Sequence, residues 1–406
     1  VSGIVINDTL TFSSLKSISL SSSKNIVVNG TLISYPSGDV VHRITFTGIN
    51  ENNFVGGTDV VTDSDIGLWI MGEGHVNLQG ALKGTWKLTD PKGGIEAAIA
   101  AAKAQPRNII IGGTPSGYSH IFIKSSRPQN ISYVQLQYMG PRKNRGGDSA
   151  KEFVTGRYAC HFHHSGDGSR GSYIVGCVAK NCNSHCFVPH GSHGIKMLDN
   201  MVFDVMETPF WYDFNHKTDD LTWDNNLVAN VSYIPRSLNQ DSGDSPTFGA
   251  GGFVLGFGDG NSCTNNLVYK TSGSGGESAA YIWPELRDDS DNTKAMDSPW
   301  VFQNNIAHSC PLGIFVWQNS EFNHIVENFQ AYYCDISIQH GAYTNQYNYQ
   351  GGYIFGGPID LRAASISTSR VRFERMTIDA NRGDYCVIVN EGPLNGISPV
   401  LFRDCK

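Results

Sequence analysis

Charge is scarce in this chain of 406 residues. Charged residues make up 17% of it, against roughly 25% in an average soluble domain. Acidic residues outnumber basic ones, 37 to 30, which leaves a net charge of −7. Nucleic acids and anionic membranes bind basic surfaces, so the composition argues against both as general partners. No apolar run approaches the roughly 18 residues of a membrane-spanning helix, and we predict no transmembrane segment.

Long helix-forming stretches are also few, whereas glycine is abundant at 45 residues, above the usual share of about 7%. From Val1 to about Leu88, short apolar runs alternate with glycine and asparagine turns, as in "GIVINDTLTF" and "NIVVNGTLISY". Alternation with a period of two residues predicts short strands. One helix is expected from Gly93 to Ala104, where the segment is rich in alanine and Pro106 follows its end.

The cysteines lack the paired C-x-x-C spacing of zinc ribbons. Nine are scattered along the chain, at Cys160, Cys177, Cys182, Cys186, Cys263, Cys310, Cys334, Cys386 and Cys405. Scattered cysteines and low charge favour a secreted protein with a few disulfides, and we expect Cys177 or Cys182 to pair with Cys160 or Cys186. Buried free thiols in a reducing compartment are the alternative. Because nine is odd, at least one thiol is free or pairs outside the chain.

Glycosylation sequons occur at Asn7, Asn29, Asn130 and Asn230. They are consistent with the hypothesis of an extracellular or cell-surface glycoprotein.

A loose repeat follows the expected helix. Segments such as "LTWDNNLVANV", "SCTNNLVYKT" and "VFQNNIAHSC" carry asparagine at the same point, at Asn200, Asn226, Asn266, Asn305 and Asn328. Short stacked strands with asparagine at the turns are typical of a parallel β-helix, in which amides can hydrogen-bond along the axis. We therefore predict an all-β protein, a right-handed parallel β-helix (solenoid) over residues 111–406. The strands of residues 1–110 form either its first rungs or an N-terminal β-rich cap.

Histidine is concentrated in one segment, "GRYACHFHHSGDG". If "CHFHH" is a strand, His161 and His163 share one face and lie about 7 Å apart. The two imidazoles can hold one metal ion if the next rung supplies a third ligand, for which His185, His190, His193 and Asp204 are candidates. General acid–base work and hydrogen bonding to a sugar are alternatives. A purely structural role at a turn is a third.

The order of the blocks "RPQNISYVQLQYMG", "GRYACHFH" and "HGSHGIKMLDNMVFDV" resembles the cell migration-inducing hyaluronidases and their transmembrane relative, with which fibrocystin shares a module. The resemblance covers about residues 1–215. It implies an eight-glycine-like β domain over residues 1–110, then a β-helix that acts on a polysaccharide. The positions that match the family's site are Arg157, His161, His163, His190 and Asp204. Thr208 stands where the family usually has a histidine, and Asp213 replaces a glutamate.

Hydrolysis of a glycosidic bond usually needs two carboxyl groups. Asp204, Glu207 and Asp213 are the nearest candidates, and Asp204 pairs more easily with Asp213 or Asp167 than with Glu207. Cleavage of a uronate polymer by β-elimination needs a base and a group that neutralises the carboxylate instead. Local positive charge for that purpose comes from Arg157, Arg170 and the run with Arg142, Lys143 and Arg145.

A set of aromatic residues and an acidic loop are two further candidates for ligand binding. Aromatic side chains can stack on sugar rings or fill the core: Trp211, Tyr212, Trp283, Trp300 and Trp317. The acidic loop from Asp288 to Asp297 can hold calcium, although it lacks EF-hand spacing.

Two functions remain open from the sequence. The first is an extracellular hydrolase or lyase of an anionic polysaccharide, such as a glycosaminoglycan, with calcium or zinc as a candidate cofactor. The second is a non-catalytic glycan-binding, adhesive or filament-forming surface protein. We expect Arg157, His161, His163, His190 and Asp204 to converge on one exposed face, with Asp213 as a further candidate catalytic residue.

Overall fold

The computed structural model describes residues 1–144, 151–212, 216–232, 250–273, 278–284, 298–316, 322–340, 346–361, 371–379, 385–389 and 400–406. Its contacts divide the chain into two units. The first comprises Val1–Asp213 and Ile234–Gly243, and the second comprises Phe214–Tyr233 and Asp244–Lys406. Each unit is described by itself.

Three parallel sheets form the first unit. The histidine sheet, named for its last two strands, contains β1 (Ile4–Ile6), β4 (Ile26–Val28), β7 (Leu68–Gly72), β10 (Ile121–Ser125), β15 (Cys160–Gly166) and β18 (Phe187–Ser192). The second sheet contains β2 (Thr9–Phe12), β5 (Thr31–Ser34), β8 (His75–Gln79), β11 (Asn130–Ser132), β16 (Tyr173–Val175) and β19 (Lys196–Leu198). The third sheet contains β3 (Ile18–Ser22), β6 (His42–Phe46), β9 (Ile109–Gly112), β12 (Val134–Gln137), β17 (Val178–Lys180) and β20 (Met201–Met206).

The second unit is built in the same way. One sheet contains β21 (Thr222–Asp224), β24 (Ser262–Thr264), β27 (Val301–Gln303), β30 (Asn323–Glu327), β33 (Gln346–Gln350), β36 (Val371–Glu374) and β39 (Leu401–Arg403). Another contains β22 (Leu227–Ser232), β25 (Leu267–Thr271), β28 (Ile306–His308), β31 (Gln330–Tyr332), β34 (Tyr353–Phe355) and β37 (Thr377–Asp379). The third contains β23 (Phe253–Val254), β26 (Ala279–Trp283), β29 (Leu312–Val316), β32 (Ile336–His340), β35 (Ile359–Leu361) and β38 (Val387–Val389).

In both units the chain visits the three sheets in turn, so each rung adds one strand to each sheet. In the first unit, for example, β7, β8 and β9 are followed by β10, β11 and β12, and each later strand pairs in parallel with the earlier one. This topology is that of a parallel β-helix, which confirms the predicted fold class. The predicted boundary at residue 110 falls within β9, and the strands before it form rungs of the same three sheets.

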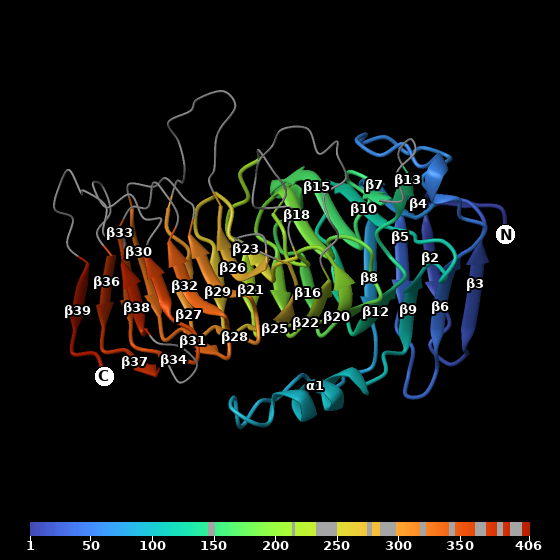
Figure 1. The fold of residues 1–406 in the computed structure, drawn as a ribbon. Coiled ribbons are helices and arrows are strands. Elements are labelled where there is room, and N and C mark those ends of the chain that lie inside the picture. Colours follow the sequence, from blue (N-terminus) through green and yellow to red (C-terminus); the bar gives the residue numbers. More distant parts are fainter. Residues whose placement is uncertain are drawn as a thin grey trace. The chain divides into compact units, whose positions relative to one another are not determined.

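A few elements lie outside the rungs. The helix α1 (Ile95–Lys103) falls within the predicted Gly93–Ala104 segment and lies outside the stacked strands (Figure 1). Strands β13 (Arg142–Asn144) and β14 (Lys151–Phe153) form an antiparallel pair. Short 3-10 turns occur as η1 (Glu51–Asn53) and η2 (Asp167–Ser169). None of the helices in the described part of the chain is long and apolar enough to cross a membrane.

Asparagines of the repeat occupy a two-residue corner in the second unit. The first corner residue has a left-handed backbone, with φ of 53° at Asn225, 57° at Asn265, 56° at Asn304 and 50° at Asn328. Asparagine tolerates this conformation better than most residues with a side chain. The second corner residue points inward, as at Asn226, Asn266 and Asn305. The structure therefore corrects the predicted row at Asn328, which lies one position earlier, in the outer row.

The inward asparagines form a hydrogen-bonded ladder. The side-chain amide of Asn226 donates to Oδ1 of Asn266 over 3.0 Å, and that of Asn266 donates to Oδ1 of Asn305 over 3.1 Å. All three side chains are fully buried. Each amide satisfies its neighbour, so the ladder buries polar groups without leaving them unpaired.

The predicted disulfides are wrong, since all nine cysteines are free thiols. Most of them are buried and act as small apolar side chains of the core. Several sit at corners, where the thiol contacts the carbonyl two residues before it, as in Cys177 with Val175 and Cys186 with Ser184. Among the expected pairs, Cys182 and Cys186 contact each other as hydrogen-bonded free thiols and are not joined by a disulfide.

Candidate functional site

The histidine-rich segment forms β15, with His161 on the outer face of its sheet. The row that leads through Val27 and Trp69 to His161 begins at Val5, which is 61% exposed. The alternate row, from Ile6 through Ile70 to Phe162, is buried along its length and therefore faces the interior of the helix. Because alternate side chains of a strand face opposite sides, His161 faces outward.

The outer face is nevertheless covered at this point. Trp69, Phe122 and His161 are aligned on β7, β10 and β15, and all three are fully buried. The cover consists of residues 54–66 and 154–158, which we call the roof. The guanidinium of Arg157 in the roof lies 4.6 Å from the ring centre of Trp69 and 5.1 Å from that of Phe122.

His161 is held in one orientation beneath the roof. Its Nδ1 donates to the carbonyl oxygen of Gly156 over 2.8 Å, and its ring meets that of Phe122 edge to face at 5.4 Å. Burial, together with the neighbouring His163 and His190, lowers the pKa of His161 well below its usual value. The imidazole is therefore neutral at physiological pH, with its proton on Nδ1 and its lone pair on Nε2.

His163, His164 and His190 form a chain of imidazoles beside His161. His163 and His190 are direct partners on β15 and β18, and their Nδ1 atoms lie 3.2 Å apart. The Nε2 of His190 lies 3.1 Å from the Nε2 of His164. His163 is half-buried, His190 is buried and His164 is exposed, so the chain leads from the covered face to solvent. Burial first, then His164 and Lys124, lowers the pKa of His163 to about 3.

An ion pair lies next to this chain at the surface. Lys124 on β10 bonds Asp59 of the roof, with the two side chains 37% and 42% exposed. The charges of both residues act on His163, which indicates that they are close to it. Alternation in "IFIKS" puts Lys124 on the same outer face as Phe122. This alternation is the sequence signal that places Lys124 on the face of the histidines.

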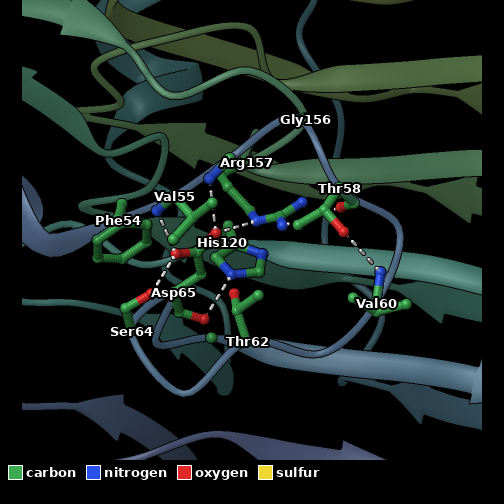
Figure 2. Close-up of polar contacts among 12 residues, drawn as sticks. Phe54, Val55, Thr58, Val60, Thr62, Ser64, Asp65, His120, Gly156 and Arg157 are labelled. Carbon is green, nitrogen blue, oxygen red and sulfur yellow. Dashed lines mark hydrogen bonds and ion pairs between the residues drawn. The ribbon is translucent and has the colours of Figure 1, made fainter.

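Arg157 anchors the roof, as Figure 2 shows. Its Nε donates to Oδ2 of Asp65 over 2.8 Å, and another guanidinium nitrogen donates to the carbonyl of Thr58 over 2.9 Å. Asp65 also accepts from the backbone N–H groups of Val55 and Gly56, over 2.6 Å and 2.9 Å. Burial raises the pKa of Asp65, but these hydrogen bonds and the charge of Arg157 outweigh it, and the pKa is lowered.

The structure therefore corrects the expectation that Arg157 lies on an exposed face. Both side chains of the pair with Asp65 are 0% exposed. His161 is also fully buried, so neither group presents itself to a polysaccharide in this structure.

Asp204 does not join the histidines. It lies on β20 of the third sheet, where it has a left-handed backbone with φ of 53°, and it forms an ion pair with Lys103 of α1. Asn181 occupies the aligned corner of the preceding rung and has the same φ of 53°. Asp204 is thus a corner residue, which corrects its predicted place in the site. Asp213 lies outside the described residues.

The described aromatic residues for which sugar stacking and core packing were both open belong to the core. Trp211, Tyr212, Trp283 and Trp300 are at most 3% exposed, so they do not offer faces to a sugar. The loop from Asp288 to Asp297, together with Arg145 and Trp317, lies outside the described residues.

A second buried polar cluster lies elsewhere in the first unit. Glu207 accepts from Arg142 over 2.8 Å and lies 3.7 Å from Nε2 of His185. The carbonyl of Thr208, at the position where a histidine was expected, accepts from Nδ1 of His185 over 2.6 Å. Arg142, His185 and Glu207 are thus committed to one another and not to the histidine chain. Arg170 pairs with Asp167 at the surface.

Within the first unit, one set of three described residues has the geometry to bind a metal ion. One ring nitrogen each from His161, His163 and His190 lies within 4.8 Å of the others. His161 and His163 were predicted as a pair, and the aligned neighbour on the next strand supplies the third imidazole. His164 and the Lys124–Asp59 pair surround the set and were missed.

The fold and these side chains define a parallel β-helix with a cluster of imidazoles on the outer face of one sheet. Comparison with known proteins agrees: residues 117–242 match the family described as CEMIP beta-helix, and this segment contains all four histidines of the cluster. The resemblance to the cell migration-inducing hyaluronidase family is thereby confirmed.

Two curated relatives are similar over part of the chain. The protein rliB of Dictyostelium discoideum is 26% identical over 200 residues, which is 43% of this chain and 16% of that protein. The human cell surface hyaluronidase CEMIP2 is 27% identical over 124 residues, 29% of this chain and 8% of that protein. The matched segments are thus small parts of both relatives.

Proposed function

We propose that this chain binds and cleaves an anionic polysaccharide of the hyaluronan type at the histidine cluster. The observation that carries the proposal is that the segment matching the CEMIP beta-helix family contains the four clustered histidines. A human protein similar to this segment is named a cell surface hyaluronidase. The same relative supports an extracellular or cell-surface location, whereas the free thiols remove the disulfide argument for it.

The arrangement suits a polymer that carries carboxylates. Lys124 is the cation next to His163, and its side chain reaches solvent. At present it bonds the carboxylate of Asp59. A uronate carboxylate can take the place of Asp59 against the ammonium group, since both are exposed enough to exchange partners. The sugar would then lie over His163, the half-buried imidazole of the cluster.

The chemistry favoured by these groups differs from that of a usual glycoside hydrolase. Asp65 is held in the buried pair with Arg157, and Asp204 lies on another sheet. Among the described residues, the predicted carboxylate pair is therefore not assembled beside the histidines. The groups that are assembled are imidazoles next to a cation, and burial lowers the pKa of two of them, His161 and His163. This set favours β-elimination, in which the proton next to the uronate carboxylate is removed, the C4–O bond breaks, a C4–C5 double bond forms, and the leaving oxygen takes up a proton.

Non-catalytic binding is the second candidate function. It is favoured by the roof, which buries its own Arg157 and the underlying His161, whereas His163, His164 and the Lys124–Asp59 pair lie near solvent. A binding protein needs no more than this surface.

The test is incubation of the protein with hyaluronan and a panel of other glycosaminoglycans, followed by sizing of the products. We expect hyaluronan to be shortened by the wild type but not by His163→Gln. His75→Gln is the matched control, because His75 is a half-buried histidine of β8 in the second sheet. Products of elimination carry an unsaturated uronate that absorbs ultraviolet light, whereas products of hydrolysis do not. Binding without any shortening would reject catalysis and leave the second candidate.

A further inference from the structure

We propose that His161, His163 and His190 form a binding site for one divalent transition-metal ion of the zinc type. The inference adds a cofactor to the site of the proposed function. The role of the metal rests on the proposed function, whereas the existence of the site does not. The site itself is inferred from the positions of three side chains on two neighbouring strands.

Spacing is the first argument. One ring nitrogen of each imidazole lies within 4.8 Å of the others. Zinc–nitrogen distances of about 2.1 Å in a tetrahedral site place two ligand nitrogens about 3.4 Å apart. The two Nδ1 atoms of His163 and His190 are already 3.2 Å apart. The pair therefore needs only small adjustments, and His161 closes the third corner.

Orientation of the rings is the second argument. The Nδ1 of His161 donates to the Gly156 carbonyl, which directs the lone pair of this ring to Nε2. The Nε2 of His190 meets His164, which leaves Nδ1 of His190 for the metal. Metal-binding histidines commonly have the second ring nitrogen held by such a partner. When a metal binds, the proton shared between His163 and His190 moves to an Nε2 atom, and both rings stay neutral.

The ligand type selects the metal. Three imidazoles without a carboxylate among them suit zinc and neighbouring transition metals, whereas calcium and magnesium prefer oxygen ligands. Three protein ligands leave the fourth position of a tetrahedral site open, as in catalytic zinc sites. His163 is half-buried, so this side is the one nearest to solvent. A glycan oxygen or a water molecule can take the open position.

The experiment measures metal directly. The full chain is stripped with a chelator, incubated with zinc, desalted and analysed for zinc per chain by elemental mass spectrometry. We expect one zinc in the wild type and in His75→Gln, and none in His163→Gln or His190→Gln. His164→Ala should weaken zinc binding about 10–100-fold, as expected for a residue that orients a ligand. His163 is half-buried and His190 is buried, so circular dichroism checks that both glutamine variants fold.

Three outcomes overturn the inference: no zinc in the wild type, zinc that survives both glutamine variants and so belongs to thiols elsewhere, or calcium bound in preference to zinc. The metal site and the proposed function can fail separately. Stoichiometric zinc lost in the two variants, with no effect on any polysaccharide, supports the site and rejects the function. Hyaluronan shortened equally by chelated and zinc-loaded protein supports the function and rejects the metal.

Discussion

In the second unit, buried asparagines repeat from rung to rung, whereas the roof over the histidine sheet of the first unit is held by the buried pair of Arg157 with Asp65. Asn226, Asn266 and Asn305 hydrogen-bond to one another in a row along the axis. The pair of Arg157 with Asp65 has no such repetition, and it joins parts of the chain that are 92 residues apart. A polar residue that repeats on every rung can hydrogen-bond to the same residue on the next rung. A polar group that does not repeat needs a hydrogen-bond partner from another part of the chain.

The difference between repeated and non-repeated polar residues helps to distinguish residues that stabilise the fold from residues that bind a ligand. A repeated asparagine is explained by the fold alone, because every rung needs a corner. A unique cluster of imidazoles is not required by any rung, and the roof that orders it adds chain that the β-helix does not need. We therefore expect variants of the clustered histidines to affect ligands, and variants of the buried roof pair and of the asparagine corner to affect folding.

The largest expected effect is on the roof. Asp65→Asn leaves the buried guanidinium of Arg157 without a counter-charge, and breaking one side of a buried pair costs about 3–5 kcal/mol. Denaturant unfolding of the variant and the wild type measures this loss. Asp63→Asn is the matched control, because Asp63 is an exposed neighbour and its substitution should change stability by less than about 0.5 kcal/mol. Equal stability of the two variants would show that the roof does not depend on the pair.

A smaller loss is expected at the ladder. Asn266→Ala removes the acceptor of two bonds from Asn226, and each buried group left unpaired costs about 1–3 kcal/mol. Asn265→Gly changes the exposed outer corner residue, where glycine adopts the positive φ without strain, so its cost should stay below about 1 kcal/mol. Thermal unfolding compares the two neighbours. The argument for the ladder fails if the outer variant is the less stable one.

The third prediction concerns pH and the second unit. Burial lowers the pKa of His324 to about 4, and its ring stacks on Tyr347 at 4.5 Å. As pH falls below about 6.5, the unfolded chain takes up a proton that the folded chain refuses until about pH 4, so stability decreases in this window. His324→Phe keeps the stacking and removes the titration.

Between pH 7 and pH 5 the variant should therefore lose about 2 kcal/mol less stability than the wild type. Denaturant midpoints at the two pH values measure the difference. An identical pH dependence of the two proteins would mean that His324 is not buried as described.

Repetition also explains which features were predictable from the sequence. Short alternating runs and recurrent asparagines predicted the parallel β-helix, and period two placed His161 and His163 on one face. The roof was not predictable, because Asp65 and Arg157 have no local signal that they meet. Asp204 was assigned by resemblance of its block, yet its side chain follows its corner position and turns toward Lys103. Sequence spacing thus predicted contacts along and between rungs, and failed for contacts made by the segments that cover them.

The smallest expected effect on stability is at Asp204, where it tests whether this residue is a corner residue or a site residue. If this residue is a corner residue, Asp204→Asn should lose only the surface ion pair with Lys103, which is worth about 0–1 kcal/mol. Asparagine fits the left-handed backbone there, as Asn181 does on the preceding rung. Asp204→Ala should lose about 1–2 kcal/mol more, because alanine is strained at positive φ. Thermal unfolding of both variants tests this order. Zinc uptake should be the same in Asp204→Asn as in the wild type. A loss of zinc in that variant would mean that Asp204 belongs to the histidine cluster, and the distinction between corner residues and site residues would then be wrong.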